Sequence, residues 1–126
     1  MKAAANDSDI CCPPRLVLDR IGDKWSVLIV LNLRDGPKRF SELRELLHHV
    51  TPKVLTHTLR GMERDGLVTR TVFAEVPPRV EYELTPLGHS LGPVMEPINA
   101  WAAKHVDEVL SLRKAHDARF ADEFVG

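Results

Sequence analysis

The stretch TPKVLTHTLRGMERD, residues 51–65, decides the fold of this chain. Thr51 and Pro52 are a capping residue and a first-turn proline, and Gly66 follows where a helix should end. Apolar side chains recur along the stretch at spacings of four and three residues, at Leu55, Leu59 and Met62. This periodicity predicts a helix with one buried face.

The opposite face of this helix carries three cations, a hydroxyl and an imidazole: Lys53, Thr56, His57, Arg60 and Arg64. Long donors reach guanine edges and phosphates, and shorter polar groups permit close approach, so this composition suits insertion into the major groove of DNA. The free N–H groups after Thr51 also suit a phosphate. A face that only keeps the helix soluble is the alternative.

Gly61 is unusual inside such a helix, because glycine there costs about 1 kcal/mol relative to alanine. Close approach to DNA, close approach to a neighbouring helix and a tolerated imperfection are the three explanations. The sequence leaves all three open.

Three helices are predicted before this stretch. Pro13-Pro14 is expected to form the first turn of a short helix, and Asp23 to cap a core helix over residues 24–34. Ser41 is expected to cap a third helix, which ends in a turn at residues 48–50. Two short helices joined by a tight turn therefore lie side by side in the sequence.

After the helix at residues 51–65 the pattern changes to that of strands. Residues 67–73 and 79–84 are rich in Val, Thr, Phe and Tyr and are expected to form a small β-hairpin. Its tip, residues 74–78, contains Pro77-Pro78, which cannot pair in a ladder and should protrude. The order of elements predicts a mainly α protein with a small β-hairpin (α+β), a winged helix-turn-helix.

Thr85-Pro86 opens the last helical region, in which Pro93 and Pro97 predict a kink or break near Gly92. Its apolar side chains exceed what a small core needs from one terminal helix. Helices from both chain ends are therefore expected to pair across a twofold axis, with operator half-sites about 10 bp apart. Residues 1–11 and 117–126 are expected to be flexible tails.

Length and composition limit the class of protein. The 126 residues allow one domain, residues 1–126, and the 44% apolar and 28% charged residues are typical of a soluble globular chain. No window holds the ~18 uninterrupted apolar residues that a membrane span needs, and the start lacks the apolar centre of a secretory signal. A cytoplasmic protein is expected.

Charge is distributed unevenly, although the net charge is only −1. Residues 36–64 hold six basic and three acidic residues, whereas residues 94–126 hold four basic and six acidic ones. The asymmetry predicts a basic face in the middle of the chain, with ordinary solvated faces as the alternative. The candidate DNA-contacting residues are Lys38, Arg39, Ser41, Thr51, Pro52, Lys53, Thr56, His57, Arg60, Arg64 and Arg79.

Several motifs together resemble the HxlR family of bacterial transcriptional regulators, relatives of the MarR group. The resemblance covers residues 12 to about 105. Its motifs are IGDKW at residues 21–25, GPKRFSEL at 36–43, PKVL at 52–55, DGLV at 65–68 and PPRVEYELT at 77–85.

The resemblance implies a homodimeric winged helix that binds a palindromic operator in double-stranded DNA. Lys53, Thr56, His57 and Arg60 match positions of the family's recognition helix, and Arg79 matches its wing arginine. His57 and Gly61 depart from the long polar residues usual there, which leaves the preferred base sequence open.

The resemblance also places a cysteine just before the first-helix proline, here Cys12, and in some members that thiol senses electrophiles or oxidants. A thiolate at a helix N-terminus is stabilised by the helix dipole. Cys11 can resolve an oxidised Cys12 only through a strained vicinal disulfide, so a bond to the partner subunit is easier. An inert, buried thiol is the alternative.

Other functions have weaker support. His48-His49 lacks further residues at metal-ligand spacing, and no phosphate loop or nucleophile motif is present, so no metal, cofactor or enzyme activity is expected. Two alternatives to a cysteine-sensing repressor remain. One is a regulator with a silent cysteine that responds to a small-molecule inducer in a pocket lined by Trp25, Met95 and Trp101. The other is a winged helix used as a protein-interaction module.

Overall fold

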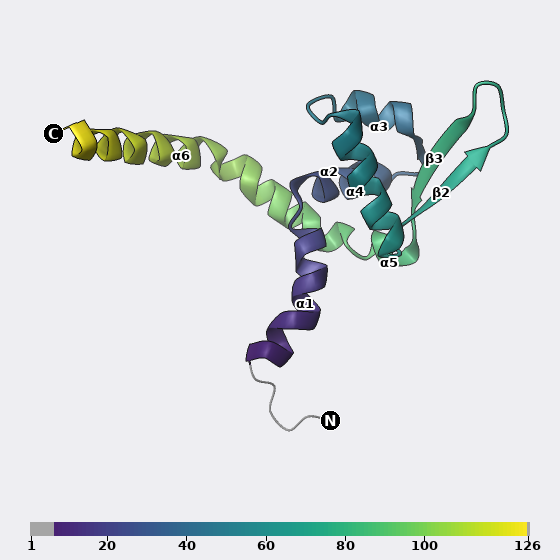
Figure 1. The fold of residues 1–126 in the computed structure, drawn as a ribbon, viewed down its shortest axis with the longest axis horizontal. Coiled ribbons are helices and arrows are strands. Elements are labelled where there is room, and N and C mark those ends of the chain that lie inside the picture. The colour runs from purple at the N-terminus through teal and green to yellow at the C-terminus, as the bar shows by residue number, and fades with distance from the viewer. Residues whose placement is uncertain (1–6, 126) are drawn as a thin grey trace. The chain divides into compact units, whose positions relative to one another are not determined.

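The chain folds into helices and a small antiparallel sheet (Figure 1). The computed structural model describes the backbone of residues 7–125 and the side chains of residues 14–121. Its elements are α1 (Asp7–Ile21), α2 (Lys24–Leu33), β1 (Lys38–Arg39), α3 (Phe40–Leu46), α4 (Pro52–Arg64), β2 (Val68–Phe73), β3 (Arg79–Leu84), α5 (Pro86–His89) and α6 (Gly92–Val125). This order confirms the predicted winged helix-turn-helix.

The chain divides into two units, one that ends at Met95 and one that begins at Glu96. The first holds the sheet and all helices up to the start of α6, and the second is the remainder of α6. None of the helices described has the length and apolar character that crossing a lipid bilayer requires.

The core of the first unit lies between α2, α3, α4 and the sheet. Leu55, Leu59 and Met62 of α4 are completely buried, as their spacing predicts. They pack in one cluster with apolar side chains of the neighbouring elements, among them Ile29, Val30, Leu33, Leu43, Tyr82 and Leu84. Burial of one such side chain stabilises the fold by roughly 1.5–3 kcal/mol, so this face fixes how α4 lies on the core.

Three of the predicted helix caps are confirmed. The Asp23 carboxylate accepts hydrogen bonds from the backbone N–H groups of Trp25 (2.8 Å) and Ser26 (3.3 Å). Thr51 Oγ1 accepts from Val54 N at 3.2 Å, and Thr85 Oγ1 from Gly88 N at 3.0 Å. The break near Gly92 is also confirmed, because α5 ends at His89 and α6 begins at Gly92.

The predicted cap at Ser41 is wrong. Helix α3 already begins at Phe40, and Arg39 is its capping residue. The Glu42 carboxylate accepts a hydrogen bond from the Arg39 backbone N–H at 2.9 Å, which satisfies this helix end without a serine. Ser41 therefore lies in the first turn of α3.

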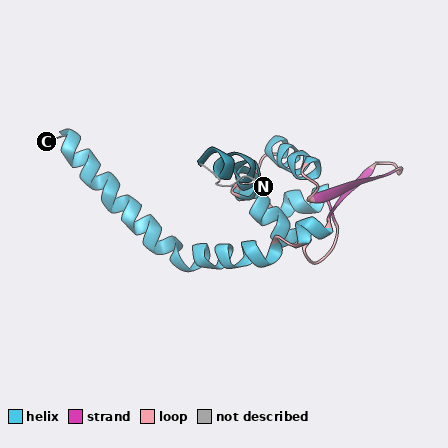
Figure 2. Cartoon of the chain, turned by 90° about the horizontal axis from the view of Figure 1, so that it is seen from below, coloured by secondary structure: helices cyan, strands magenta, loops and turns pink. Residues whose placement is uncertain are grey.

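The sheet has three strands in the order β1-β3-β2, one more than the predicted hairpin. The additional strand β1 pairs with β3, with Lys38 opposite Tyr82 and Arg39 opposite Glu81. Strands β2 and β3 pair from Val68 with Leu84 to Phe73 with Arg79, and together they project from the helices as the wing (Figure 2).

The chain ends differ from expectation. Helix α1 begins at Asp7, so Pro13-Pro14 lies inside the helix and not in its first turn. Each proline removes one backbone hydrogen bond and its ring crowds the carbonyl four residues earlier, so the pair disturbs α1 at this point although its φ is helical. Residues 7–11 and 117–125, expected as tails, are helical, and Phe120 stacks on His116 one turn earlier. Residues 1–6 and 126 lie outside the described residues.

Candidate nucleic-acid interface

Helix α4 presents its predicted polar face away from the core. Thr51, Pro52, Lys53, His57, Arg60 and Arg64 are exposed, and Thr56 is half-buried. This side of α4 therefore offers donors of different lengths on a helix whose other side is fixed by the core. A helix held in this way suits the reading of base edges, because side-chain donors must meet them at hydrogen-bond distance.

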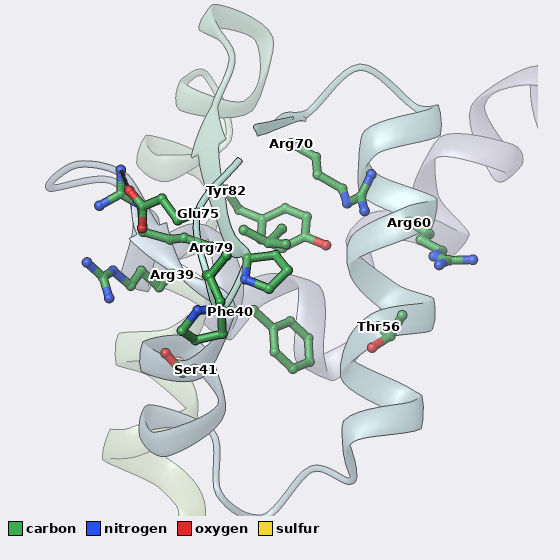
Figure 3. A pocket seen from close by; sticks show the side chains of 13 residues that line it. Arg39, Phe40, Ser41, Thr56, Arg60, Arg70, Glu75, Arg79 and Tyr82 are labelled. Atoms are coloured by element: carbon green, nitrogen blue, oxygen red, sulfur yellow. Dashed lines mark ion pairs between the residues drawn. The ribbon is translucent and has the colours of Figure 1, made fainter. Parts of the chain in front are cut away.

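A cleft of about 560 Å³ separates α4 from the sheet and the start of α3. Figure 3 looks into it and shows Thr56 and Arg60 on α4 across from Phe40 and the Tyr82 phenol. Its lining residues are Arg39, Phe40, Ser41, Thr56, Arg60, Arg70, Tyr82 and residues 75–80 of the wing. The cleft therefore brings together five of the predicted DNA-contacting residues: Arg39, Ser41, Thr56, Arg60 and Arg79.

The cleft is strongly basic. Its lining residues include four guanidinium groups, those of Arg39, Arg60, Arg70 and Arg79, and Glu75 is the one carboxylate among them. Clefts lined by one sign of charge concentrate the field, so this surface attracts polyanions. The net charge of −1 does not reveal this local surplus, because acidic residues elsewhere in the chain offset it.

Arg70 was not predicted to belong to the site. It lies opposite Tyr82 in the sheet, and its guanidinium charge acts on the phenol. Burial raises the pKa of Tyr82, and the nearby Arg70 charge opposes that rise. The available signal was strand alternation, because Arg70 stands two residues after the buried Val68 and shares its side of β2.

Arg79 lies next to the tip of the wing, opposite Phe73, and is already paired within the chain. Its Nη2 lies 3.3 Å from Glu75 Oε1, and its Nε lies 3.3 Å from Glu81 Oε2 without hydrogen-bond alignment. Its guanidinium carbon also lies 4.0 Å from the centre of the Phe73 ring. A contact between Arg79 and DNA would therefore require it to exchange these intramolecular partners.

The remaining candidates do not line this cleft. Lys38 is half-buried in β1, and Lys53, His57 and Arg64 lie on α4 outside the cleft lining. Thr51 and Pro52 line a second hollow of about 640 Å³ together with Ser41, Arg44, His48 and His49. The rings of His48 and His49 are 4.0 Å apart, and no three potential metal ligands gather among the described side chains.

The two candidate redox residues lie in α1, but their side chains are outside the described residues. Helix α1 includes Cys11 and Cys12, directly before Pro13-Pro14. The side chains considered for a ligand pocket differ in exposure. Met95 is completely buried in the core and Trp25 is half-buried, whereas Trp101 is 61% exposed.

Two helices joined by a tight turn, an exposed polar face on the second and a flanking wing define the class. This is a winged helix-turn-helix protein of the kind that regulates transcription by binding DNA.

The comparison with protein families gives the particular family. The profile of the HxlR-like helix-turn-helix family matches residues 20–110. The chain therefore belongs to this family, which confirms the resemblance inferred from its motifs.

Individual relatives agree with this assignment. The HTH-type transcriptional regulator YdeP of Bacillus subtilis is 43% identical over 84% of this chain and 85% of its own length. The structure of a transcriptional regulator, ytfH from Salmonella typhimurium, has a TM-score of 0.76 and 38% identity and covers 88% of this chain and 99% of its own. The redox regulator HypR in its reduced form has a TM-score of 0.69 and 39% identity, covering 79% and 98%.

Proposed function

We propose that this chain is a sequence-specific DNA-binding regulator that represses transcription by binding a palindromic operator as a homodimer. The observation that carries the proposal is the basic cleft, in which α4 and the wing meet with four arginines and one carboxylate among the lining residues. Phosphate contacts position such a protein, and donors on the exposed face of α4 read the bases.

The assignment of roles follows from position. Lys53, Thr56, His57 and Arg60 are proposed to face the major groove, with Arg64 at the end of the same helix. Arg79 is proposed to reach the adjacent minor groove or backbone from the wing, and Arg70 joins it as a backbone contact. The remaining candidates, Lys38, Arg39, Ser41, Thr51 and Pro52, are proposed to contact phosphates.

Homodimerisation is supported by apolar side chains that the chain leaves exposed. Leu16, Val17 and Leu18 of α1 are 76%, 58% and 61% exposed. Helix α6 exposes further large apolar residues, among them Ile98 and Trp101. Exposed apolar surface of this kind marks an interaction site, and a second copy would also supply the second recognition helix that a palindrome requires.

The test of DNA binding is a titration of the purified protein with duplex DNA from upstream of its own coding sequence, at several salt concentrations. The proposal predicts tight binding that weakens steeply with salt, since each phosphate contact releases a counterion. An affinity for DNA that depends on neither salt concentration nor base sequence would contradict a repressor and would favour the protein-interaction module.

We further propose that Cys12 couples thiol chemistry to DNA release, with Cys11 as the second candidate. The support is the position of Cys12 in α1, a helix with exposed apolar side chains, and the description of the relative HypR as a redox regulator. A thiol oxidised to a disulfide, or alkylated by an electrophile, can shift the pairing of two subunits. A swing from mostly bound to mostly free requires about 5.5 kcal/mol, which a covalent constraint can supply.

The test compares operator binding before and after treatment with diamide or a quinone. The native protein should release DNA, Cys11→Ser should respond like the native protein, and Cys12→Ser should not respond. Release that persists in Cys12→Ser would move the sensor to Cys11 or elsewhere. A native protein that does not respond would leave a regulator whose signal is a non-covalent inducer.

A further inference from the structure

Gly61 of α4 is a poor helix former in the helix proposed to read DNA. The structure shows what occupies the space that a larger residue would fill. The guanidinium group of Arg20, from α1, lies directly over Gly61, and a methyl group there would overlap it. Close approach by a neighbouring helix therefore explains this glycine.

Arg20 is held in that position by a second contact with the same helix. Its Nε donates a hydrogen bond to Asp65 Oδ2 at 2.7 Å, a charge-assisted pair. Asp65 is the C-cap residue of α4, one turn after Gly61. The guanidinium of Arg20 is therefore fixed by Asp65 while it covers Gly61, and it contacts α4 at two points along its length.

These contacts lie on the opposite side of the helix from the basic cleft. Arg20 and Asp65 border a separate, mainly apolar cavity with Leu16, Leu67 and Leu91, and neither of them lines the cleft. Arg60 comes directly before Gly61, and Arg64 comes directly before Asp65. Both arginines are exposed. A small rotation of α4 about its axis would change the contact with Arg20 and the aim of Arg60 and Arg64 together.

We propose that Arg20 is a positioning residue for DNA recognition, which fixes the rotation of α4 through Asp65 and the space over Gly61. The inference rests on the proposed function. The pair is 26% and 38% exposed, so it contributes little to folding, but base contacts require donors placed within hydrogen-bond limits. Its loss should therefore reduce discrimination between DNA sequences more than it reduces stability.

The test uses Arg20→Gln, Asp65→Asn and their double variant, with Arg15→Gln as the control that removes the same charge from an exposed site on α1. Binding is measured against the duplex that the native protein selects from a random pool and against an unrelated duplex, at several salt concentrations. Each variant should bind the selected duplex about fivefold more weakly, a typical size for coupling between sites. The double variant should lose no more than the single ones, and the unrelated duplex and the salt dependence should not change.

Gly61→Ala provides an independent variant. Alanine favours the helix, so the melting temperature should stay the same or rise, whereas the displaced Arg20 should lower affinity for the selected duplex. A structural role alone would change melting and affinity in the same direction.

Two results would overturn the inference. Equal losses on both duplexes, with a lower salt dependence for Arg20→Gln, would make Arg20 a phosphate contact. Unchanged affinity for the selected duplex with a lower melting temperature would make the pair merely structural. If the native chain selects no duplex, the proposed function itself fails, and the native protein alone reveals this before any variant is made.

Discussion

Helices α4 and α6 differ in how much of their apolar surface the chain itself covers. In α4 every residue of the predicted apolar stripe, Leu55, Leu59 and Met62, is completely buried. From residue 96 to residue 121, no side chain of α6 is buried. The large apolar side chains exposed there are Ile98, Trp101, Val106, Leu110, Leu112 and Phe120. The chain itself therefore buries the apolar side of α4, whereas α6 carries the exposed apolar surface on which the proposed homodimer depends.

The buried side of α4 should give the largest effect on stability. Leu59→Ala removes a completely buried side chain from the core, and we expect a loss of about 3 kcal/mol in the free energy of unfolding. Chemical denaturation of Leu59→Ala and of Lys53→Ala, on the exposed side of the same helix, measures this. Equal losses for the two variants would contradict the orientation of α4.

The exposed apolar side chains of α6 should matter for assembly and not for the fold of the first unit. Ile98→Asp combined with Trp101→Asp should convert the proposed dimer to a monomer. Operator affinity should fall roughly a hundredfold, because a monomer contacts only one of the two half-sites. Sedimentation at micromolar concentration measures the change. Ala100→Asp adds one of these charges on the other side of the helix and should remain dimeric; a native monomer would refute the interpretation of α6.

On the polar side of α4, Arg60 should determine sequence preference. Arg60→Ala is expected to cost about 1–3 kcal/mol of binding free energy and to change which bases are preferred, because a bidentate base contact is lost. Competition between the operator and single-base variants of it measures the preference. A uniform loss on all duplexes would instead assign Arg60 to the phosphates.

The wing should give the smallest effect, because Arg79 already has partners within the chain. Arg79→Ala should weaken binding of all sequences slightly and reduce the salt slope by about one charge. Glu75→Gln frees Arg79 from its partner at 3.3 Å and should strengthen binding by about twofold, the scale of an exposed ion pair. If Arg79→Ala lowers the affinity for DNA and Glu75→Gln raises it, Glu75 competes with DNA for Arg79. If both variants change the affinity in the same direction, such competition is excluded.

Features set by local sequence were predictable. Caps at Asp23, Thr51 and Thr85 depend on residues within three positions, and the buried stripe of α4 depends on periodicity within one helix. For the same reason the sequence predicted the polar face of α4 and the break before α6.

Features set by contacts distant in sequence were missed. Strand β1 has two residues and exists only because it pairs with β3, more than forty positions later. Arg70 enters the site only through its place opposite Tyr82. Gly61 became interpretable only when Arg20, from another helix, was found over it. Arg39, Arg60 and Arg79 were candidates from the sequence alone, but their convergence with Arg70 in one cleft was not predicted.

The most direct test of the account is to select bound duplexes from a random DNA pool with the purified native protein and to sequence them. The account predicts enrichment of an inverted repeat whose half-site centres lie about 10 bp apart, one recognition helix in each half. Recovery of an unenriched pool, or of a single half-site without its inverted copy, would contradict a homodimer that reads DNA with α4.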